Sequence, residues 1–345
     1  MKLTHFYRAL CATLLMALAA MPATAQEREQ EQKQKLAKPT VVDQVETAYR
    51  QGNFAELERL YAIYGKAGVR SELTGTPRVK HFWMGIDKIN DSSLRVSDEY
   101  YQQLDALTGQ WARQYSQSVL AQLLYANTLR THAWARRGHG YANTVSSTAW
   151  AEFKNYTSLA KEQLQKNETL AANDSGWNKE MLAIGRALDW DNEQLRRIFE
   201  AGIAKNPDDD DLYFSMQGAL LPKWGGDIPT IERFIAWADK HTRDQRGLEM
   251  YARLYAGLSY AQLSQALFTN TNASWTSMKI GFEDRLKRYP HSDHRNMYAY
   301  FACMANDRQA LQEQLELIGD KFTPAFWGDN PERTFESCKK MAQQT

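Results

Sequence analysis

From Val41 onward, apolar residues recur at three- and four-residue spacing, which places them on one face of an α-helix. The first such pattern spans Val41–Tyr49, pauses at Gly52-Asn53, and resumes with the same period over Phe54–Tyr64. Glycine commonly ends a helix, so this pause predicts a helical hairpin. No stretch alternates apolar and polar residues as a half-buried strand does.

The same period predicts further helices down the chain and therefore an all-α fold. Stop signals fall at Asn206-Pro207, Trp224–Gly226, Tyr289-Pro290 and Phe322–Pro324, while residues 65–77 form a looser stretch. The expected helices cover residues 79–89, 97–111, 116–136, 148–165, 179–188, 193–205, 211–221, 230–240, 247–268, 274–289, 293–305, 308–318 and 332–341.

The hairpin turn over Ala48–Phe54 is similar to the turn of tetratricopeptide repeats, in which glycine ends one helix and an aromatic residue begins the next. Two later segments, Glu200–Pro207 and Phe282–Pro290, end a basic helix with proline just before another helix, as tetratricopeptide units do. Such repeats cannot bury their faces alone. We therefore expect residues 40–345 to form one domain of tetratricopeptide-like helical hairpins, stacked as in a solenoid.

The first 25 residues have the three parts of a secretory signal peptide. Lys2 and Arg8 give a positive start, Ala9–Met21 is apolar, and Ala23-Thr24-Ala25 is a small-residue cleavage site. The apolar run is shorter than the ~20 residues of a membrane-spanning helix, so we expect no membrane span after cleavage. The sequence predicts export, to the periplasm or, alternatively, outside the cell, with residues 26–39 as a flexible polar leader.

Cleavage after Ala25 leaves 320 residues with 40 basic and 41 acidic side chains, a net charge of −1. A near-neutral chain lacks the basic field that nucleic-acid binding needs, so we expect no nucleic-acid partner. Two cysteines remain, Cys303 and Cys338. In an oxidising compartment they can form one disulfide, or they can be two separate buried thiols; the sequence leaves both open.

Two glycine-bearing segments could form a binding site. In the first, Trp134–Gly140, the indole of Trp134, the guanidinium of Arg137, the Gly138 turn and His139 could hold a carboxylate or phosphate. The structural interpretation, in which Gly138 is a plain helix terminator and the arginines offset the helix dipole, is the favoured one. In the second, Lys223–Asp227, the side chains of Lys223 and Trp224 could stack on and pair with a ligand, or the segment could be a rigid corner with its tryptophan in the core.

These segments also carry a family resemblance. Trp134 with Arg137-Gly138, the Leu-x-Pro-Lys-Trp-Gly-Gly corner at Leu220–Gly226, and Asn296-x-x-Ala-x-x-Ala before Asp307 resemble a bacterial domain-of-unknown-function family of tetratricopeptide-like helical proteins. The match covers roughly Ser97 to Trp327. The resemblance implies the fold and a bacterial origin and brings no catalytic residues; Asp227 departs from it, since a small hydroxyl residue is expected there.

Other chemistry has weaker support. His291 and His294 flank Asp293 at a spacing that could ligate a metal, but a distant third ligand would be needed, and we expect no metal or cofactor. The carboxylates at 208–211 suit a helix start, and Asp189 with Asp191 suits a charged turn. No catalytic serine elbow or zinc-protease motif is present.

The sequence therefore predicts an exported helical scaffold that binds a protein or peptide in the cell envelope and has no catalysis of its own. It leaves the oligomeric state open. The alternative is a small-ligand-binding or hydrolytic protein whose pocket lies between the Trp134–Gly140 and Lys223–Asp227 loops.

Overall fold

The computed structural model describes residues 39–66, 68–94 and 96–344, so the expected signal peptide and nearly all of the leader lie outside the described residues. These residues are all-helical, as predicted, and their one extended pairing is an isolated bridge between Arg70 and Pro77. The α-helices are α3 (Val41–Arg50), α4 (Phe54–Tyr64), α5 (Arg78–Asp87), α6 (Asp98–Gln114), α7 (Val119–Arg137), α8 (Ser147–Lys166), α9 (Glu168–Ala171), α10 (Ser175–Ala187), α11 (Asn192–Lys205), α12 (Asp210–Ala219), α13 (Ile228–Arg246), α14 (Glu249–Leu258), α15 (Leu267–Asn270), α16 (Trp275–Arg288), α17 (Ser292–Met304), α18 (Arg308–Ile318) and α19 (Pro331–Ala342).

Short polar side chains begin many of these helices. Ser118 accepts a hydrogen bond from the backbone N–H of Ala121, and Asp191 forms a capping box with Gln194. Asp227 accepts from the N–H of Thr230 at 2.7 Å and so caps α13. Aspartate is among the residues that cap helices best, so Asp227 suits the start of α13.

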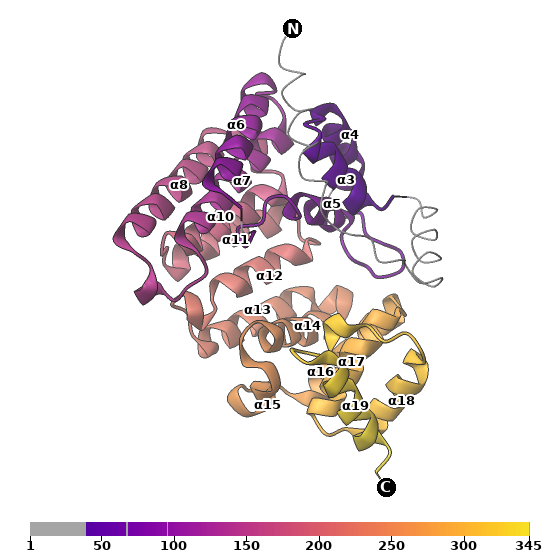
Figure 1. Cartoon of the computed structure of the whole chain (residues 1–345). Coiled ribbons are helices and arrows are strands. Elements are labelled where there is room, and N and C mark those ends of the chain that lie inside the picture. Colours follow the sequence, from indigo (N-terminus) through magenta and orange to yellow (C-terminus); the bar gives the residue numbers. More distant parts are fainter. Residues whose placement is uncertain (1–38, 67, 95, 345) are drawn as a thin grey trace, which may run out of the picture. The chain divides into compact units, whose positions relative to one another are not determined.

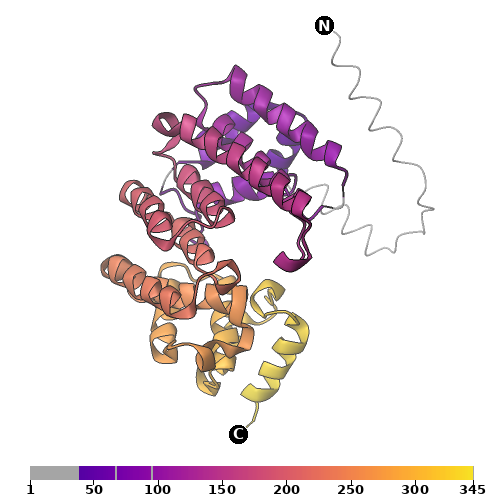
Figure 2. The same cartoon turned by 90° about the vertical axis from the view of Figure 1, so that its left-hand side faces the viewer.

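Helices neighbouring in sequence pack against each other through the structure (Figure 1). Contacts between helices that are not neighbours in sequence include those of α7 with α10, α10 with α12, and α12 with α14, which together form a row. Helices α8, α11 and α13 each pack against members of this row. The turned view shows the same progression from the early helices to the last ones (Figure 2). The row α7–α10–α12 positions the candidate site.

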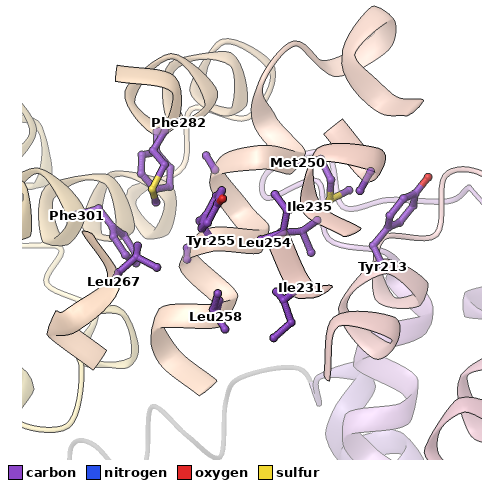
Figure 3. Close-up of a cluster of buried hydrophobic side chains, with 14 of the residues drawn as sticks. Tyr213, Ile231, Ile235, Met250, Leu254, Tyr255, Leu258, Leu267, Phe282 and Phe301 are labelled. Carbon is purple, nitrogen blue, oxygen red and sulfur yellow. The ribbon is translucent and has the colours of Figure 1, made fainter. Parts of the chain in front are cut away.

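The buried apolar side chains form three clusters. The first joins α3–α7 around Trp111 and Phe82, and the second joins α7–α10 around Trp177. The largest runs from α10 to α19 and includes Tyr255 and Phe301, which Figure 3 shows among their aliphatic neighbours. The apolar faces predicted from periodicity are thus buried between helices.

One predicted helix is interrupted. The pattern over 247–268 predicts a continuous helix, but α14 ends at Leu258 and a π-helix, η3 (Ser259–Leu263), follows it. Ser264 then has φ 46° and ψ −123°, and its carbonyl accepts a hydrogen bond from the Ser259 hydroxyl at 2.7 Å. The chain turns here while keeping its helical apolar spacing, which is why periodicity alone predicts no break.

The loop over residues 68–77, here called the docking loop, reaches distant helices. A backbone hydrogen bond within the loop stabilises its conformation, since the Ser71 N–H donates to the Thr76 carbonyl at 2.8 Å. The Thr74 carbonyl lies 2.9 Å from Nε2 of His294 on α17 and also accepts from Arg285 on α16. Gly75, with φ 64°, lies so close to Tyr289 that an added Cβ would be 2.4 Å from the ring. The docking loop therefore ties the first hairpin to α16 and α17.

Cys303 on α17 and Cys338 on α19 form a disulfide with an S–S distance of 2.00 Å. The sequence leaves open whether these cysteines form a disulfide or are two separate thiols, and in the structure they form the disulfide. The bond fixes α19 to α17.

Candidate functional site

Two adjacent cavities lie between the docking loop, α5 and the helices α7, α10 and α12. Their volumes are about 460 and 390 Å³, and both are lined by Trp83, Gly176 and Lys179, so they form one depression, here called the central groove. Volumes of this size lie in the range of ligand sites. The other lining residues that the argument uses are Lys66, Arg70, Met84, Asp87, Leu123, Asn127, Lys205 and Phe214.

The middle of the central groove is apolar. The indole of Trp83 is half-buried, Met84 is 46% exposed, and Phe214 of α12 is half-buried. Gly176 lets Leu123 approach closely at this point, because an added Cβ would lie 2.9 Å from the Asp174 carboxylate and 3.0 Å from Leu123. A partner's apolar side chain can therefore be received here.

The two ends of the groove differ in charge. In the first cavity, Lys66 has no acidic partner among the described residues, and the ammonium of Lys205 donates only to the Ala172 carbonyl, at 2.9 Å. In the second cavity, the Asp87 carboxylate has no ion pair within the described chain. Desolvation in the groove raises the pKa of Asp87 to about 6; Arg130 opposes the shift and Glu180 adds to it. One end thus has ammonium groups without a carboxylate partner, in a lining that also contains Asp174, Asp208 and Asp209, and the other end has a carboxylate that titrates near pH 6.

The face of α7 that lines the groove continues into an aromatic cluster. Leu123 and Asn127 line the second cavity, and Trp134 and Arg137 follow them at helical spacing along α7. The ring of Trp134 meets the ring of Trp224 edge to face, with centroids 5.4 Å apart. The structure therefore brings together the two segments that the sequence singles out.

Two guanidiniums stack on these rings. Arg137 lies 5.2 Å from the Trp134 centroid and 4.8 Å from that of Trp150, and Arg186 of α10 lies 4.6 Å from that of Trp224. We call these five side chains the tryptophan cluster. Burial lowers the pKa of Arg186 to about 10, and the charge of Arg130 adds to the shift.

The tryptophan cluster has more donors than acceptors. Nε of Arg137, Nε of Arg186 and Nε1 of Trp224 are buried without a hydrogen-bond partner. No acidic side chain pairs with Arg137 or Arg186 in the part of the chain that the structure describes. The cluster therefore presents uncompensated positive charge on an aromatic surface, an arrangement that attracts a carboxylate.

The remaining predicted residues lie around this cluster. Gly138 ends α7 with φ 74°, and its carbonyl accepts from Nη1 of Arg137 at 3.0 Å. His139 is exposed, with Nε2 3.1 Å from the Ser92 carbonyl, and the exposed Lys223 lies 6.0 Å from the Trp224 ring centroid. Because the rings of Trp134 and Trp224 are in contact, no ligand fits between them, and one would have to bind beside them.

The backbone conformation of the corner at Leu220–Asp227 requires its two glycines. Gly225 is left-handed, with φ 86°, and an added Cβ at Gly226 would lie 1.9 Å from the Leu220 carbonyl oxygen. Trp224 is half-buried, one side on the core and the other under Arg186. The corner thus holds the indole in the tryptophan cluster.

The histidines and aspartates that the sequence supports only weakly as chemical sites have structural roles. His294 contacts the docking loop, and its pKa falls to about 4 because it is buried and beside Arg285. Asp209 caps α12, Asp191 caps α11, and Asp189 has φ 55° in the turn before it. Across the described residues, no three His, Cys, Asp or Glu side chains are grouped to hold a metal ion.

Sequence reasoning missed the central groove. Trp83, Asp87 and Arg186 belong to no local motif, and the first two become part of a site only through the cavity that α5 lines together with α7, α10 and α12. Within the described residues no helix is both long and apolar enough to cross a bilayer. Comparison with protein-family models, with curated proteins and with solved structures finds no match to this chain.

Proposed function

We propose that this protein is an exported helical scaffold that binds an extended peptide segment of an envelope protein in the central groove, without catalysis of its own. The observation that carries the proposal is the groove itself, which has an apolar middle at Trp83 and Met84, lysines without a carboxylate partner at one end and the Asp87 carboxylate without an ion pair at the other. Helical-repeat proteins commonly use such surfaces to bind extended chains. The export part rests on the sequence of the first 25 residues.

The charges of the groove define the peptide chemistry. Lys66 and Lys205 would receive an acidic residue, Trp83 and Met84 an apolar one, and Asp87 a basic one. The uncompensated cations of the tryptophan cluster continue the same face of α7 and would extend the contact to a second acidic residue. The expected partner segment is therefore acidic, then apolar, then basic along its length, with a second acidic residue beyond the basic one.

A displayed library of random dodecapeptides tests this proposal, because twelve extended residues span up to about 40 Å. Selection on the protein beginning at Gln26 should enrich peptides with the acidic, apolar, basic order. Affinities are then measured by isothermal titration with synthetic peptides. Failure to enrich any peptide, or enrichment of peptides with no common order, would contradict the proposal.

A pair of matched variants locates the binding site. Met84→Glu puts a charge into the apolar middle of the groove, and Leu159→Glu does the same on α8, outside both cavities; the two side chains are 46% and 41% exposed. We expect Met84→Glu to weaken peptide binding at least tenfold, a cost of about 1.4 kcal/mol, and Leu159→Glu to leave it unchanged. Equal affinities for the two variants would place the peptide elsewhere.

A further inference from the structure

A third cavity, separate from the central groove, lies between η3, α17 and the start of α19. Its volume is about 240 Å³, below the usual range for drug-sized ligands, so it suits a smaller molecule. Tyr260, Tyr300 and Trp327 give it aromatic walls, and Ser264, Asp329 and Asn330 are among its polar lining residues. We call it the tyrosine pocket.

The hydroxyl of Tyr300 points to a ligand. The Tyr300 side chain is only 4% exposed, and its ring stacks on Tyr260 with centroids 5.8 Å apart. The Tyr260 hydroxyl donates to the Phe326 carbonyl at 2.8 Å, whereas the Tyr300 hydroxyl has no hydrogen-bond partner among the described residues. The Tyr300 hydroxyl is therefore free to bond a ligand that carries hydroxyl groups.

Other polar groups of the tyrosine pocket are also unengaged. Asn330 begins α19 without a side-chain capping bond, and within the described chain the side chains of Ser264 and Thr334 make no hydrogen bond. Asp329 is the only charged side chain among the lining residues that the structure describes, and burial, with a further contribution from the Asp329 charge, raises the pKa of Tyr300. The pocket therefore offers several hydrogen-bonding groups and one carboxylate, which disfavours anionic ligands.

The walls of the pocket are held in place. The Cys303–Cys338 disulfide joins α17, which carries Tyr300, to α19, which carries Thr334. On the opposite side, Tyr260 lies in the π-helix and Ser264 has a strained backbone with φ 46°. π-Helices and strained residues concentrate at functional sites, and here both border one cavity.

From this geometry we propose that the tyrosine pocket binds a single sugar unit, neutral or amine-bearing, through the free Tyr300 hydroxyl and the unengaged polar groups around it. The ring of Tyr260, 38% exposed, would cover the apolar face of the sugar, because the side chains of Tyr300 and Trp327 are buried. Asp329 would exclude acidic sugars and would pair with an amine where one is present. This site is independent of the central groove and of any peptide bound there.

The test uses ligand-observed NMR on the disulfide-bonded protein with glucose, galactose, mannose, glucosamine and glucuronate. Concentrations up to about 10 mM would detect a dissociation constant of about 1 mM. We expect binding of at least one neutral or amine-bearing sugar and none of glucuronate. No binding of the first four, or equal binding of glucuronate, would overturn the proposal.

Two conservative variants locate the sugar. Tyr300→Phe removes only the hydroxyl and should weaken binding about tenfold. Tyr298→Phe on the same helix is the control, because the Tyr298 side chain is 2% exposed and its hydroxyl bonds Glu283 at 3.1 Å, outside the pocket. Equal losses in the two variants, or no loss in Tyr300→Phe, would show that the sugar does not bind at the free hydroxyl.

Discussion

Arg70 of the docking loop and Asp210 of α12 are 140 residues apart in sequence, yet two guanidinium nitrogens of Arg70 bond the two carboxylate oxygens of Asp210 at 3.0 and 2.9 Å. Arg246 and Arg253 also donate to Asp210, at 2.5 and 2.6 Å, and the Asp210 side chain is only 1% exposed. Burial opposes ionisation, but the surrounding arginines hold the pKa of Asp210 well below its usual range. The carboxylate therefore joins the docking loop to α12, α13 and α14.

Asp210→Asn should be strongly destabilising, because it leaves three buried guanidiniums without their shared carboxylate. We expect a loss of about 3–5 kcal/mol in the free energy of unfolding, measured by urea denaturation at pH 7. Arg70→Met should cost less, since Asp210 keeps two arginines. Arg196→Met, in an exposed pair with Glu193, is the control and should change stability by less than about 1 kcal/mol. Similar losses for Asp210→Asn and Arg196→Met would refute this role.

His132 should contribute to the free energy of unfolding at low pH. Its side chain is fully buried, and its nitrogens lie 2.5 Å from Asp105 and 3.0 Å from Asp98. Burial opposes protonation, but the two carboxylates raise the pKa of His132 above 6.5. The stabilisation is therefore complete below about pH 6.5 and is lost as the pH rises through the folded-state pKa.

The variant His132→Gln should lower the unfolding free energy by about 1–3 kcal/mol at pH 6 and by less at pH 9. Urea denaturation at both values checks this. His241→Gln is the control, because His241 is exposed and bonds only the Trp237 carbonyl. A loss from His132→Gln that is the same at pH 6 and pH 9 would show that the protonated ring contributes nothing.

Asp87 should make peptide binding depend on pH. With its pKa raised to about 6, the carboxyl is mostly neutral at pH 5 and mostly ionised at pH 7. A selected peptide with a basic residue at that end should bind more tightly at pH 7 than at pH 5. Titration calorimetry with Asp87→Asn, which should remove most of this difference, provides the check; an unchanged difference would assign it to another group.

Two glycines, Gly218 inside α12 and Gly226 in the corner that follows it, should respond in opposite directions to alanine. Gly226→Ala would bring Cβ against the Leu220 carbonyl and should destabilise by at least about 2 kcal/mol. Gly218, inside α12, has open space around it, so Gly218→Ala should stabilise by about 0.5–1 kcal/mol. Thermal denaturation distinguishes the two, and a stable Gly226→Ala variant would mean that the corner can rearrange.

Reducing the disulfide should lower the free energy of unfolding and also loosen the walls of the tyrosine pocket. The bond closes a loop with a sequence separation of 35, for which chain entropy gives about 3–4 kcal/mol. Unfolding is followed with and without a phosphine reductant. Cys338→Ala is the control, since the reductant should not destabilise it further, and a shift in that variant would point to another effect of the reagent.

The sequence predicts most helices because the signals that set their boundaries are local. Periodicity and short polar caps place α3, α4, α11 and α18 within a residue or two of their observed bounds. The π-helix at Ser259–Leu263 could not be predicted, because its side-chain spacing still resembles an α-helix. Short α9 has too few residues for a period to appear.

The sites depend on contacts that no local pattern contains. Trp134 and Trp224 stood out in sequence as unusual residues near glycines, but Arg186, which stacks on Trp224, lies in an ordinary helical pattern. Residues 65–77 were predicted as a loose stretch, whereas Arg70 and Thr74 are anchored by residues more than 100 positions away. Periodicity reports which face of a helix is apolar, and it does not report which distant loop meets that face.

The contact of Thr74 with Arg285 and His294 changes how this chain is expected to unfold. In an open array of repeats each unit touches only its neighbours, so the two ends can fray separately. Here the Thr74 carbonyl, which lies near the first hairpin, is bonded by Arg285 of α16 and His294 of α17. These two residues lie 211 and 220 positions further along the chain. Melting one end releases bonds at the other, and this couples early and late helices into a single cooperative transition.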